Sequence, residues 1–352
     1  METTERQVAE RINTVDALLE VKNLKKYFPI QAGLFRREIG DVKAVDNVSF
    51  KIKRGETLGL VGETGCGKTT LGRCMVRLYK PLSGQILYRY ENDAGQQMEV
   101  DLAALSGREL LPHRRDIQMI FQDPYSSLNP RRTVFDTISE PLRANKMASG
   151  RELEDRVVYL MEVVGLQTRY LRRYPHAFSG GQRQRVGIAR SLATNPRLIV
   201  ADEPVSALDV SIQAQILNLL GDLQDQFGLC YLFIAHDLSV VNYISDRVAV
   251  MYVGRMVELA ATEDLYANPK HPYTEALLSA VPISDPDFVR ERIKLAGEIP
   301  DPSDPPAGCY FHPRCRYARD LCREESPSWE EIEADHFVAC HFAAELDLRG
   351  LG

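Results

Sequence analysis

The 352-residue sequence predicts an α/β fold built on a largely parallel sheet with flanking helices. Two observations support this prediction. Short apolar runs alternate with helix-forming stretches, and one glycine-rich loop stands between a buried strand and a helix. A third observation is a change in composition, because ten of the 19 prolines lie from Pro269 onward. This change predicts a domain boundary near residue 270.

The first half of the chain supplies the expected sheet elements. Residues 18–24 and 42–52 are expected to form antiparallel strands, and residues 56–61 a buried strand. A helix is expected from Lys68 to about Leu78. These elements surround the glycine-rich loop and set its place in the fold.

A helical stretch without strands is expected between about residues 126 and 185. One helix in it begins with capping-box spacing at Ser149 and Glu152. An apolar stripe follows and stops at Gly165; its members are Leu153, Val157, Leu160, Met161 and Val164. The pattern predicts a helical subdomain inserted into the sheet domain.

Charge and cysteine content exclude some classes of protein. The net charge of −6, with a pI near 5.8, argues against a broad nucleic-acid surface. An odd count of seven cysteines argues against a disulfide framework. No apolar run approaches the ~18 residues that span a bilayer, and the first residues do not resemble a signal peptide. We therefore expect a cytosolic protein.

Residues 62–69 read Gly-Glu-Thr-Gly-Cys-Gly-Lys-Thr and fit the phosphate-loop pattern. Glycines let successive backbone N–H groups surround the phosphates of ATP, while Lys68 reaches the β- and γ-phosphates and Thr69 ligates Mg²⁺. The hydroxyl of Thr70 is expected to contact the α-phosphate. The predicted ATP contacts are Gly62, Glu63, Thr64, Gly65, Cys66, Gly67, Lys68, Thr69 and Thr70.

Two adjacent carboxylates end the apolar strand expected at residues 198–202. Asp202 is expected to hold Mg²⁺, and Glu203 to orient or deprotonate the water that attacks the γ-phosphate. Gln122 is expected to ligate Mg²⁺ or sense the γ-phosphate, and His236 to donate a hydrogen bond to it. Tyr27 is a candidate for stacking on adenine.

Residues 178–185, Phe-Ser-Gly-Gly-Gln-Arg-Gln-Arg, place a serine and two glycines where a helix is expected to begin. Such a helix start offers backbone N–H groups and the positive end of the helix dipole to a phosphate. One polypeptide thus carries two phosphate-binding sites, the loop at residues 62–69 and this helix start. Their presence together suggests that two chains share two nucleotides.

Four of the seven cysteines lie in the tail, with the spacing C-x₅-C-x₆-C-x₁₇-C; they are Cys309, Cys315, Cys322 and Cys340. Four thiolates suit tetrahedral zinc or an iron–sulfur cluster. The close cysteine pairs of structural zinc sites are absent, and the spacing also differs from ferredoxins. Free or otherwise paired thiols are the third interpretation. We expect His312 and His336 to be surface residues rather than substitute ligands.

The order and spacing of these motifs resemble those of the ATP-binding-cassette (ABC) ATPases over roughly residues 18–268. The resemblance implies a RecA-like P-loop ATPase core with an antiparallel β-subdomain, an inserted helical subdomain and a small Pro/Cys-rich C-terminal domain. It implies head-to-tail dimers in which Ser179, Gly180, Gly181 and Gln182 contact the ATP of a partner. Asp209 would lie at the shared interface, and Phe178 stands where many cassettes have leucine.

Five stretches of the sequence look like the oligopeptide and dipeptide importer ATPases, and most like the F-type subunit. They are residues 18–30, 42–46, 55–62, 122–130 and 271–278. This narrower resemblance covers nearly the whole chain. It divides the sequence into a tail (1–17), a nucleotide-binding domain (18–268, with the helical subdomain at 126–185) and a C-terminal domain (269–352). It also favours a [4Fe–4S] cluster on the four cysteines, with zinc as the alternative.

The importer resemblance implies ATP hydrolysis that energises uptake of di- or oligopeptides, with oligosaccharides or nickel as alternative cargo. The implied partners are a second, related ATPase in a heterodimer, two transmembrane permeases and an extracytoplasmic solute-binding protein. The chain would lie peripherally on the cytoplasmic face of the membrane. One alternative is a soluble ABC ATPase that acts on ribosomes or nucleic acid; it would require tandem cassettes or basic patches, whereas this sequence has one cassette and an acidic balance. A second alternative is a nucleotide-binding scaffold that does not hydrolyse ATP, and the presence of Glu203 and His236 argues against it.

Overall fold

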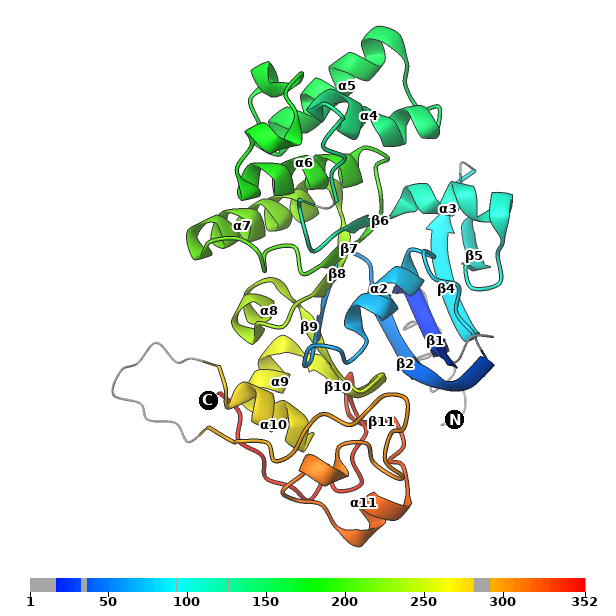
Figure 1. Ribbon diagram of the computed structural model, residues 1–352, viewed down its shortest axis with the longest axis vertical. Helices are drawn as coiled ribbons and strands as arrows, with labels where there is room; N and C mark the ends of the chain where they lie inside the picture. The colour runs from blue at the N-terminus through cyan, green and yellow to red at the C-terminus, as the bar shows by residue number, and fades with distance from the viewer. Residues whose placement is uncertain (1–16, 33–36, 93, 126, 282–291, 352) are drawn as a thin grey trace. The chain divides into compact units, whose positions relative to one another are not determined.

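The computed structural model describes residues 17–32, 37–92, 94–125, 127–281 and 292–351 (Figure 1). It comprises two compact units: unit 1, Met1–Ala104 with Ala235–Gly352, and unit 2, Leu105–Ile234. Apart from Ala17, the expected N-terminal tail lies outside the described residues.

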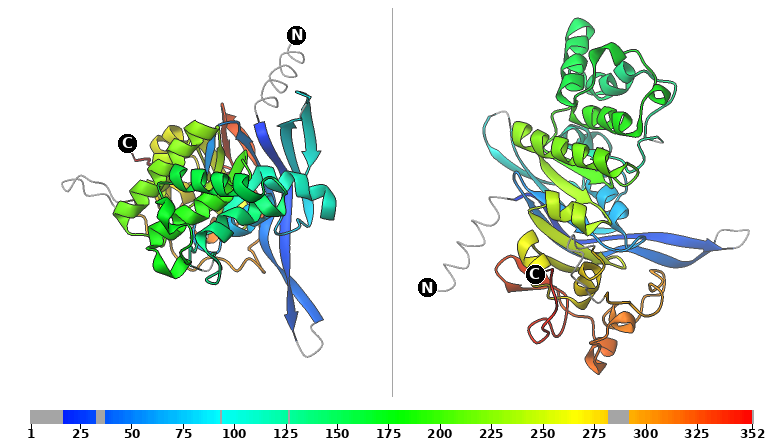
Figure 2. Two further views of the ribbon diagram at one scale, coloured as in Figure 1. Left: turned by 90° about the horizontal axis from the view of Figure 1, so that it is seen from above. Right: turned by 90° about the vertical axis from the view of Figure 1, so that its left-hand side faces the viewer.

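Unit 1 contains a four-stranded antiparallel sheet in the order β2-β1-β4-β5. Its strands are β1 (Ala17–Ala32), β2 (Arg37–Lys53), β4 (Ser83–Glu91) and β5 (Gln97–Asp101). The antiparallel pairing expected for residues 18–24 and 42–52 is confirmed, although both strands are longer. Strand β4 pairs with β1 only as far as Lys25, so the rest of β1 and β2 form a long two-stranded ribbon (Figure 2).

A second group of strands in unit 1 begins with β3 (Thr57–Val61), which runs parallel to β9 (Arg247–Tyr252). Every residue of β3 and β9 is buried, as in strands covered on both faces. The group continues antiparallel through β10 (Arg255–Ala261), β12 (His336–Val338) and β11 (Glu330–Glu333). No sequence pattern indicated the last two strands.

Short helices complete unit 1. They are α2 (Lys68–Met75), α8 (Leu238–Ile244), α9 (Thr262–Ala267), α10 (Pro272–Leu278), α11 (Asp320–Glu324) and the 3₁₀ turn η4 (His312–Arg314). Helix α2 buries Leu71, Cys74 and Met75 and ends at Met75, earlier than the expected Leu78. It follows the phosphate loop directly, so the loop lies between a buried strand and a packed helix.

Unit 2 holds three parallel strands, β6 (Ile117–Ile120), β7 (Leu198–Asp202) and β8 (Cys230–Ile234). Its helices are η1 (Gly107–Leu110), α3 (Leu111–Asp116), α4 (Val134–Ala144), α5 (Gly150–Val163), η2 (Thr168–Tyr170), η3 (Pro175–Ala177), α6 (Gly180–Leu192) and α7 (Val210–Phe227). From residue 127 to residue 185, the described chain forms helices and no strand.

Helix α5 bears out the expected stripe, because Leu153, Val157, Leu160, Met161 and Val164 are all buried. The capping box expected at its start is not formed, since the Ser149 side chain makes no capping hydrogen bond. Gly150, the first helical residue, has a φ of +55°, which takes the first turn out of the geometry that a capping box needs. At the other end, Gly165 (φ +70°) stops the helix as expected.

Candidate nucleotide-binding site

The phosphate loop joins β3 to α2 and requires glycine at two of its positions. Gly67 has a φ of +107°, and a Cβ atom there would lie 2.0 Å from the carbonyl oxygen of Ala44. A Cβ atom on Gly62 would lie 2.1 Å from the carbonyl oxygen of Met251. Both distances are far below contact, so backbone packing itself selects glycine. The loop is thereby held against β2 and β9, and its backbone is open to close approach by a ligand.

The Lys68 side chain lies inside the loop. Its ammonium group donates to the carbonyl oxygens of Gly62 (2.7 Å) and Glu63 (3.1 Å), and only 5% of the residue is exposed. Burial raises the pKa of the neighbouring Cys66 thiol, so this side chain stays neutral beside the lysine. The loop therefore encloses one uncompensated positive charge, as a phosphate site requires.

Glu63 is held by two residues from the tail side of unit 1. Its carboxylate accepts two hydrogen bonds from Arg314, at 2.6 Å from Nη1 and 3.0 Å from Nη2. Its backbone N–H donates to the Tyr273 hydroxyl at 2.8 Å. The bond to Glu63 raises the pKa of the Arg314 guanidinium, which therefore stays charged. Neither Arg314 nor Tyr273 was predicted as part of the site, because 251 and 210 positions separate them from Glu63 and no local pattern links them.

Tyr27 is anchored through its hydroxyl, which donates to Asp46 Oδ1 at 2.6 Å. Asp46 is buried and also accepts from Arg255 Nε (2.9 Å) and from the Tyr310 hydroxyl (3.2 Å). Burial, and then the bond to Asp46, raise the pKa of the Tyr27 hydroxyl, so it remains a donor. The ring is half-buried, and its stacking on adenine stays a prediction.

Unit 2 brings Gln122 and Glu203 together. The Gln122 amide Nε2 donates to Glu203 Oε2 at 2.8 Å. Asp202, the last residue of β7, is buried, and its neighbour Glu203 has a φ of +45°. Such a backbone conformation costs a residue other than glycine roughly 1–3 kcal/mol. The strand end thus fixes the direction of one carboxylate at the expense of local strain.

The serine and glycine pair lies at the start of α6, as expected. Ser179 is the N-cap residue and forms a capping box with Gln182: the Gln182 N–H donates to Ser179 Oγ (3.3 Å), and the Ser179 N–H donates to Gln182 Oε1 (3.1 Å). The first N–H groups of a helix have no partner within it, so those of Gly180 and Gly181 remain for an external anion. Asp209, the N-cap residue of α7, is exposed.

The predicted site residues are divided between the two units. Unit 1 carries Tyr27, the phosphate loop and the exposed His236, which follows β8. Unit 2 carries Gln122, Asp202, Glu203, Asp209 and the start of α6.

The four tail cysteines line one cavity in unit 1, together with Phe311 and Phe342. The Cys309 N–H donates to the Cys322 carbonyl oxygen at 2.9 Å. Burial raises the pKa of Cys315 to about 11 and that of Cys340 to about 12, so these thiols are protonated when no metal is bound. Among the described residues, no cluster of histidine, cysteine or acidic side chains has metal-binding geometry. The cavity therefore gathers a suitable donor set without a preformed ligand geometry.

The two tail histidines differ from each other. His336 was expected at the surface, and this expectation is wrong: it is 2% exposed, and its Nε2 lies 2.8 Å from Oε1 of the fully buried Glu258. The reason is that β12 pairs with β10, which brings His336 beside a buried carboxylate. His312 is half-buried, with Nδ1 3.0 Å from the Cys309 carbonyl oxygen.

In the part of the chain that the structure describes, no helix has the length and apolar character needed to cross a membrane.

Two family profiles match the sequence. The ABC transporter family matches residues 45–206, and the family "Oligopeptide/dipeptide transporter, C-terminal region" matches residues 257–322. The first match contains the phosphate loop, the α6 start and the paired carboxylates. The second contains Arg314 and three of the four tail cysteines. The two matches account for both chemically distinctive parts of the chain.

Curated relatives match over almost their whole length. The oligopeptide transport ATP-binding protein AppF of Bacillus subtilis is 56% identical over 93% of this chain and 97% of the relative. The dipeptide transport ATP-binding protein DppF of Haemophilus influenzae is 50% identical over 92% of this chain and 96% of the relative. Both identities are high enough to show common family membership.

Solved structures confirm the predicted α/β cassette fold. The ATP-binding cassette MJ0796, as a dimer in a post-hydrolysis state with ADP and phosphate, matches with a TM-score of 0.59 and 30% identity, covering 69% of this chain and 98% of that one. The structure of cbiO1 from Clostridium perfringens, part of the transporter complex cbiONQ, matches with a TM-score of 0.57 and 27% identity, covering 71% and 91%. The chain is therefore an ABC-type ATPase and belongs to the ATP-binding subunits of the oligopeptide/dipeptide ABC transporter family.

Proposed function

We propose that this chain hydrolyses ATP to energise the import of di- or oligopeptides. The observation that carries the hydrolytic part is the Gln122–Glu203 hydrogen bond, which aims a carboxylate held in a strained backbone conformation. The peptide cargo rests on the match of the tail region and on the printed names of the relatives. Oligosaccharides and nickel are alternative cargoes for the same machinery.

Within the ATP site, each group has a distinct role. Lys68 would bind the β- and γ-phosphates, and Thr69, Gln122 and Asp202 would be the residues that hold Mg²⁺. Glu203 orients the attacking water and accepts its proton. His236 donates a hydrogen bond to the γ-phosphate, and Tyr27 stacks on adenine. Backbone N–H groups of the loop surround the phosphates, but not that of Glu63, which donates to the Tyr273 hydroxyl. The buried lysine and the glycine-only loop positions support this assignment.

The start of α6 completes the ATP site of a partner cassette. Ser179, Gly180, Gly181 and Gln182 present a hydroxyl and first-turn amides to the γ-phosphate of the partner, and Asp209 lies at the shared interface. We propose the F-type subunit of a heterodimer with a second, related ATPase. Its support is the similarity to AppF and DppF, together with the dimeric cassette among the structural relatives.

The remaining partners are two transmembrane permeases and an extracytoplasmic solute-binding protein, with this chain bound peripherally on the cytoplasmic face of the membrane. Closure on ATP and reopening after hydrolysis would move the permeases through the helices of unit 2 and the Gln122 loop. Nucleic acid is not an expected partner, because the chain carries a net charge of −6.

The cysteine-lined cavity is a candidate site for a [4Fe–4S] cluster, with zinc as the alternative. Cys309, Cys315, Cys322 and Cys340 would be the ligands, and their shared cavity is the fit that supports the assignment. When bound, such a group would link four points of the tail and provide one-electron chemistry. Anaerobically purified protein should then be brown, with about four iron and four sulfide ions per chain. Colourless protein with stoichiometric zinc would overturn the cluster in favour of zinc.

Reconstitution tests the importer function. The chain is combined in proteoliposomes with its permeases, the second ATPase and the solute-binding protein, and ATP turnover is measured with and without peptide. We expect peptide-stimulated turnover and peptide accumulation, both abolished by Glu203→Gln. Stimulation by an oligosaccharide or by nickel, and not by peptide, would move the cargo to that class. The absence of any coupling between ATP turnover and a solute would refute the importer proposal.

A further inference from the structure

The cysteine-rich segment, residues 309–340, contacts the phosphate loop through the side chain of Arg314. Arg314, which precedes Cys315, forms a two-pronged ion pair with Glu63, the second residue of the loop. The Arg314 side chain is 6% exposed and that of Glu63 26%, so the pair is largely withdrawn from water. Two parallel N–H···O bonds fix direction as well as distance.

The rest of the Arg314 guanidinium has little alternative bonding. Its Nη1 reaches the Tyr252 hydroxyl only at 3.4 Å, and its buried Nε has no hydrogen-bond partner among the described residues. A buried guanidinium with an unpaired donor costs free energy. The orientation that the structure adopts nevertheless directs both terminal nitrogens at Glu63.

Glu63 is in turn part of the cage around Lys68. The carbonyl oxygen of Glu63 accepts from the Lys68 ammonium, and its N–H is bonded to Tyr273, so its backbone is fixed at both ends and its side chain by Arg314. A displaced Glu63 carboxylate would bring a negative charge closer to the phosphates and loosen the lysine cage. Holding that carboxylate away is a positioning task that Arg314 performs.

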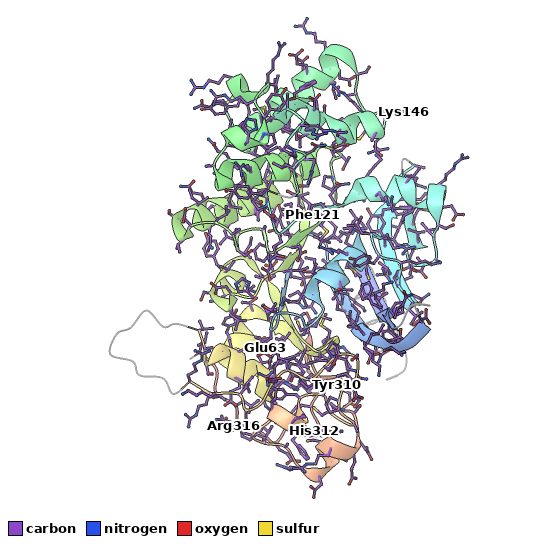
Figure 3. All side chains as sticks on the ribbon, in the orientation of Figure 1. Glu63, Phe121, Lys146, Tyr310, His312 and Arg316 are labelled. Atoms are coloured by element: carbon purple, nitrogen blue, oxygen red, sulfur yellow. The ribbon has the colours of Figure 1, made fainter. Side chains whose placement is uncertain are left out.

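A second contact reaches Tyr27 from the same segment. Tyr310, which follows Cys309, donates to Asp46, and Asp46 accepts the hydroxyl of Tyr27. Arg255 lies over the Tyr310 ring, 3.9 Å from its centroid, and also pairs with Asp46. Figure 3 labels Glu63, Tyr310, His312 and Arg316, which all belong to unit 1. The segment thus supports two separate ATP-binding features.

We propose that the cysteine-rich segment sets the affinity of the chain for ATP, with Arg314 as the positioning residue that orients the phosphate loop through Glu63. The proposal rests on the assigned role of residues 62–69 in binding ATP. Arg314 would then be a determinant of nucleotide affinity that lies outside the ATPase motifs. It belongs to the region that matches the oligopeptide/dipeptide transporter C-terminal family.

Equilibrium binding of a fluorescent ATP analogue and steady-state turnover of the assembled transporter provide the test. Arg314→Ala should weaken binding and raise KM for ATP about tenfold, equivalent to about 1.4 kcal/mol, while kcat changes less than twofold. Arg314→Lys keeps the charge without the paired geometry and should give an intermediate loss. Arg316→Ala is the matched control, because Arg316 follows Cys315 but pairs with Glu275 (2.9 Å). It should leave ATP affinity unchanged.

Coupling to Glu63 separates positioning from general damage to the fold. In a Glu63→Gln background, Arg314→Ala should cost less than twofold, because the paired carboxylate is already gone. Equal tenfold losses in both backgrounds, or an equal loss in Arg316→Ala, would overturn the proposal. Unchanged affinity in both folded Arg314 variants would also overturn it. If the wild-type chain itself failed to bind ATP, the assigned role of the loop would fail instead.

Discussion

Gly181, in the first turn of α6, is expected to tolerate no side chain, and Gly181→Ala tests why. A Cβ atom there would lie 2.5 Å from Cγ2 of Ile212 in α7, whereas ordinary carbon contacts lie at about 3.5–4.0 Å. The Ile212 side chain, or one of the two helices, must therefore shift by about 1 Å. Overpacking of this kind costs about 1–3 kcal/mol, against a gain of up to about 1 kcal/mol from replacing glycine by alanine in a helix. With that gain subtracted, the net expectation is destabilisation by up to about 2 kcal/mol.

Neighbouring substitutions isolate the clash. In Gly180→Ala the new atom would lie 3.2 Å from Cδ2 of Leu208, the flexible end of a side chain, so this variant should be neutral or slightly stabilised. Ile212→Ala removes the atom that clashes. Gly181→Ala should therefore change sign in the Ile212→Ala background and become neutral or stabilising.

Thermal melting of the four variants and the wild type, under one set of conditions, measures these differences. Gly181→Ala should melt lower by about 2–4 °C, and its ATP turnover should fall because the start of α6 is displaced. The double variant should melt no lower than Ile212→Ala alone. If Gly181→Ala costs the same in both backgrounds, the contact with Ile212 is not the reason that glycine occupies this position.

Three further outcomes are expected. Glu203→Gln should abolish phosphate release while ATP binding is retained, because the amide cannot accept the proton of water; a turnover above half the wild-type rate would remove Glu203 from that role. Gly67→Ala should abolish ATP binding and lower stability, since its Cβ would meet a backbone oxygen at 2.0 Å, and unchanged nucleotide affinity would contradict this steric argument. Glu258→Leu should destabilise the chain by about 3 kcal/mol or more, because the N–H groups of Lys270 and His271 and the ring of His336 lose their acceptor. Urea unfolding measures this loss, and the control Glu258→Gln should cost less. Equal costs for the two variants would refute this account.

The ATPase elements were predictable because their signals are local. A strand, a glycine pattern and a helix follow one another within 20 residues of Thr57, and β7 ends at its two carboxylates. The bond between Gln122 and Glu203 joins residues 81 positions apart, yet the order of the motifs along the chain predicted that both act at the γ-phosphate.

The tail was less predictable because its contacts are distant in sequence. Strands β11 and β12 have 4 and 3 residues, too few for an alternating pattern to stand out, and the glutamates of β11 favour a loop. His336 was expected at the surface because nothing local announces the buried carboxylate of Glu258, 78 positions away. Arg314 carries no local signal that it binds the phosphate loop.

The pairing of β12 and β11 with β10 has a consequence for solubility. Without the last residues of the chain, β10 would expose a row of unpaired backbone groups, and five of its seven residues are buried. An exposed apolar strand of this kind recruits strands from other molecules. Strand β11 reads Glu-Glu-Ile-Glu, so the outermost strand in the folded chain is short and acidic, which repels a second copy. The tail thus covers the edge of β10 as well as carrying the cysteines. We expect a version of the protein trimmed to its ATPase motifs to expose β10 and to aggregate more readily.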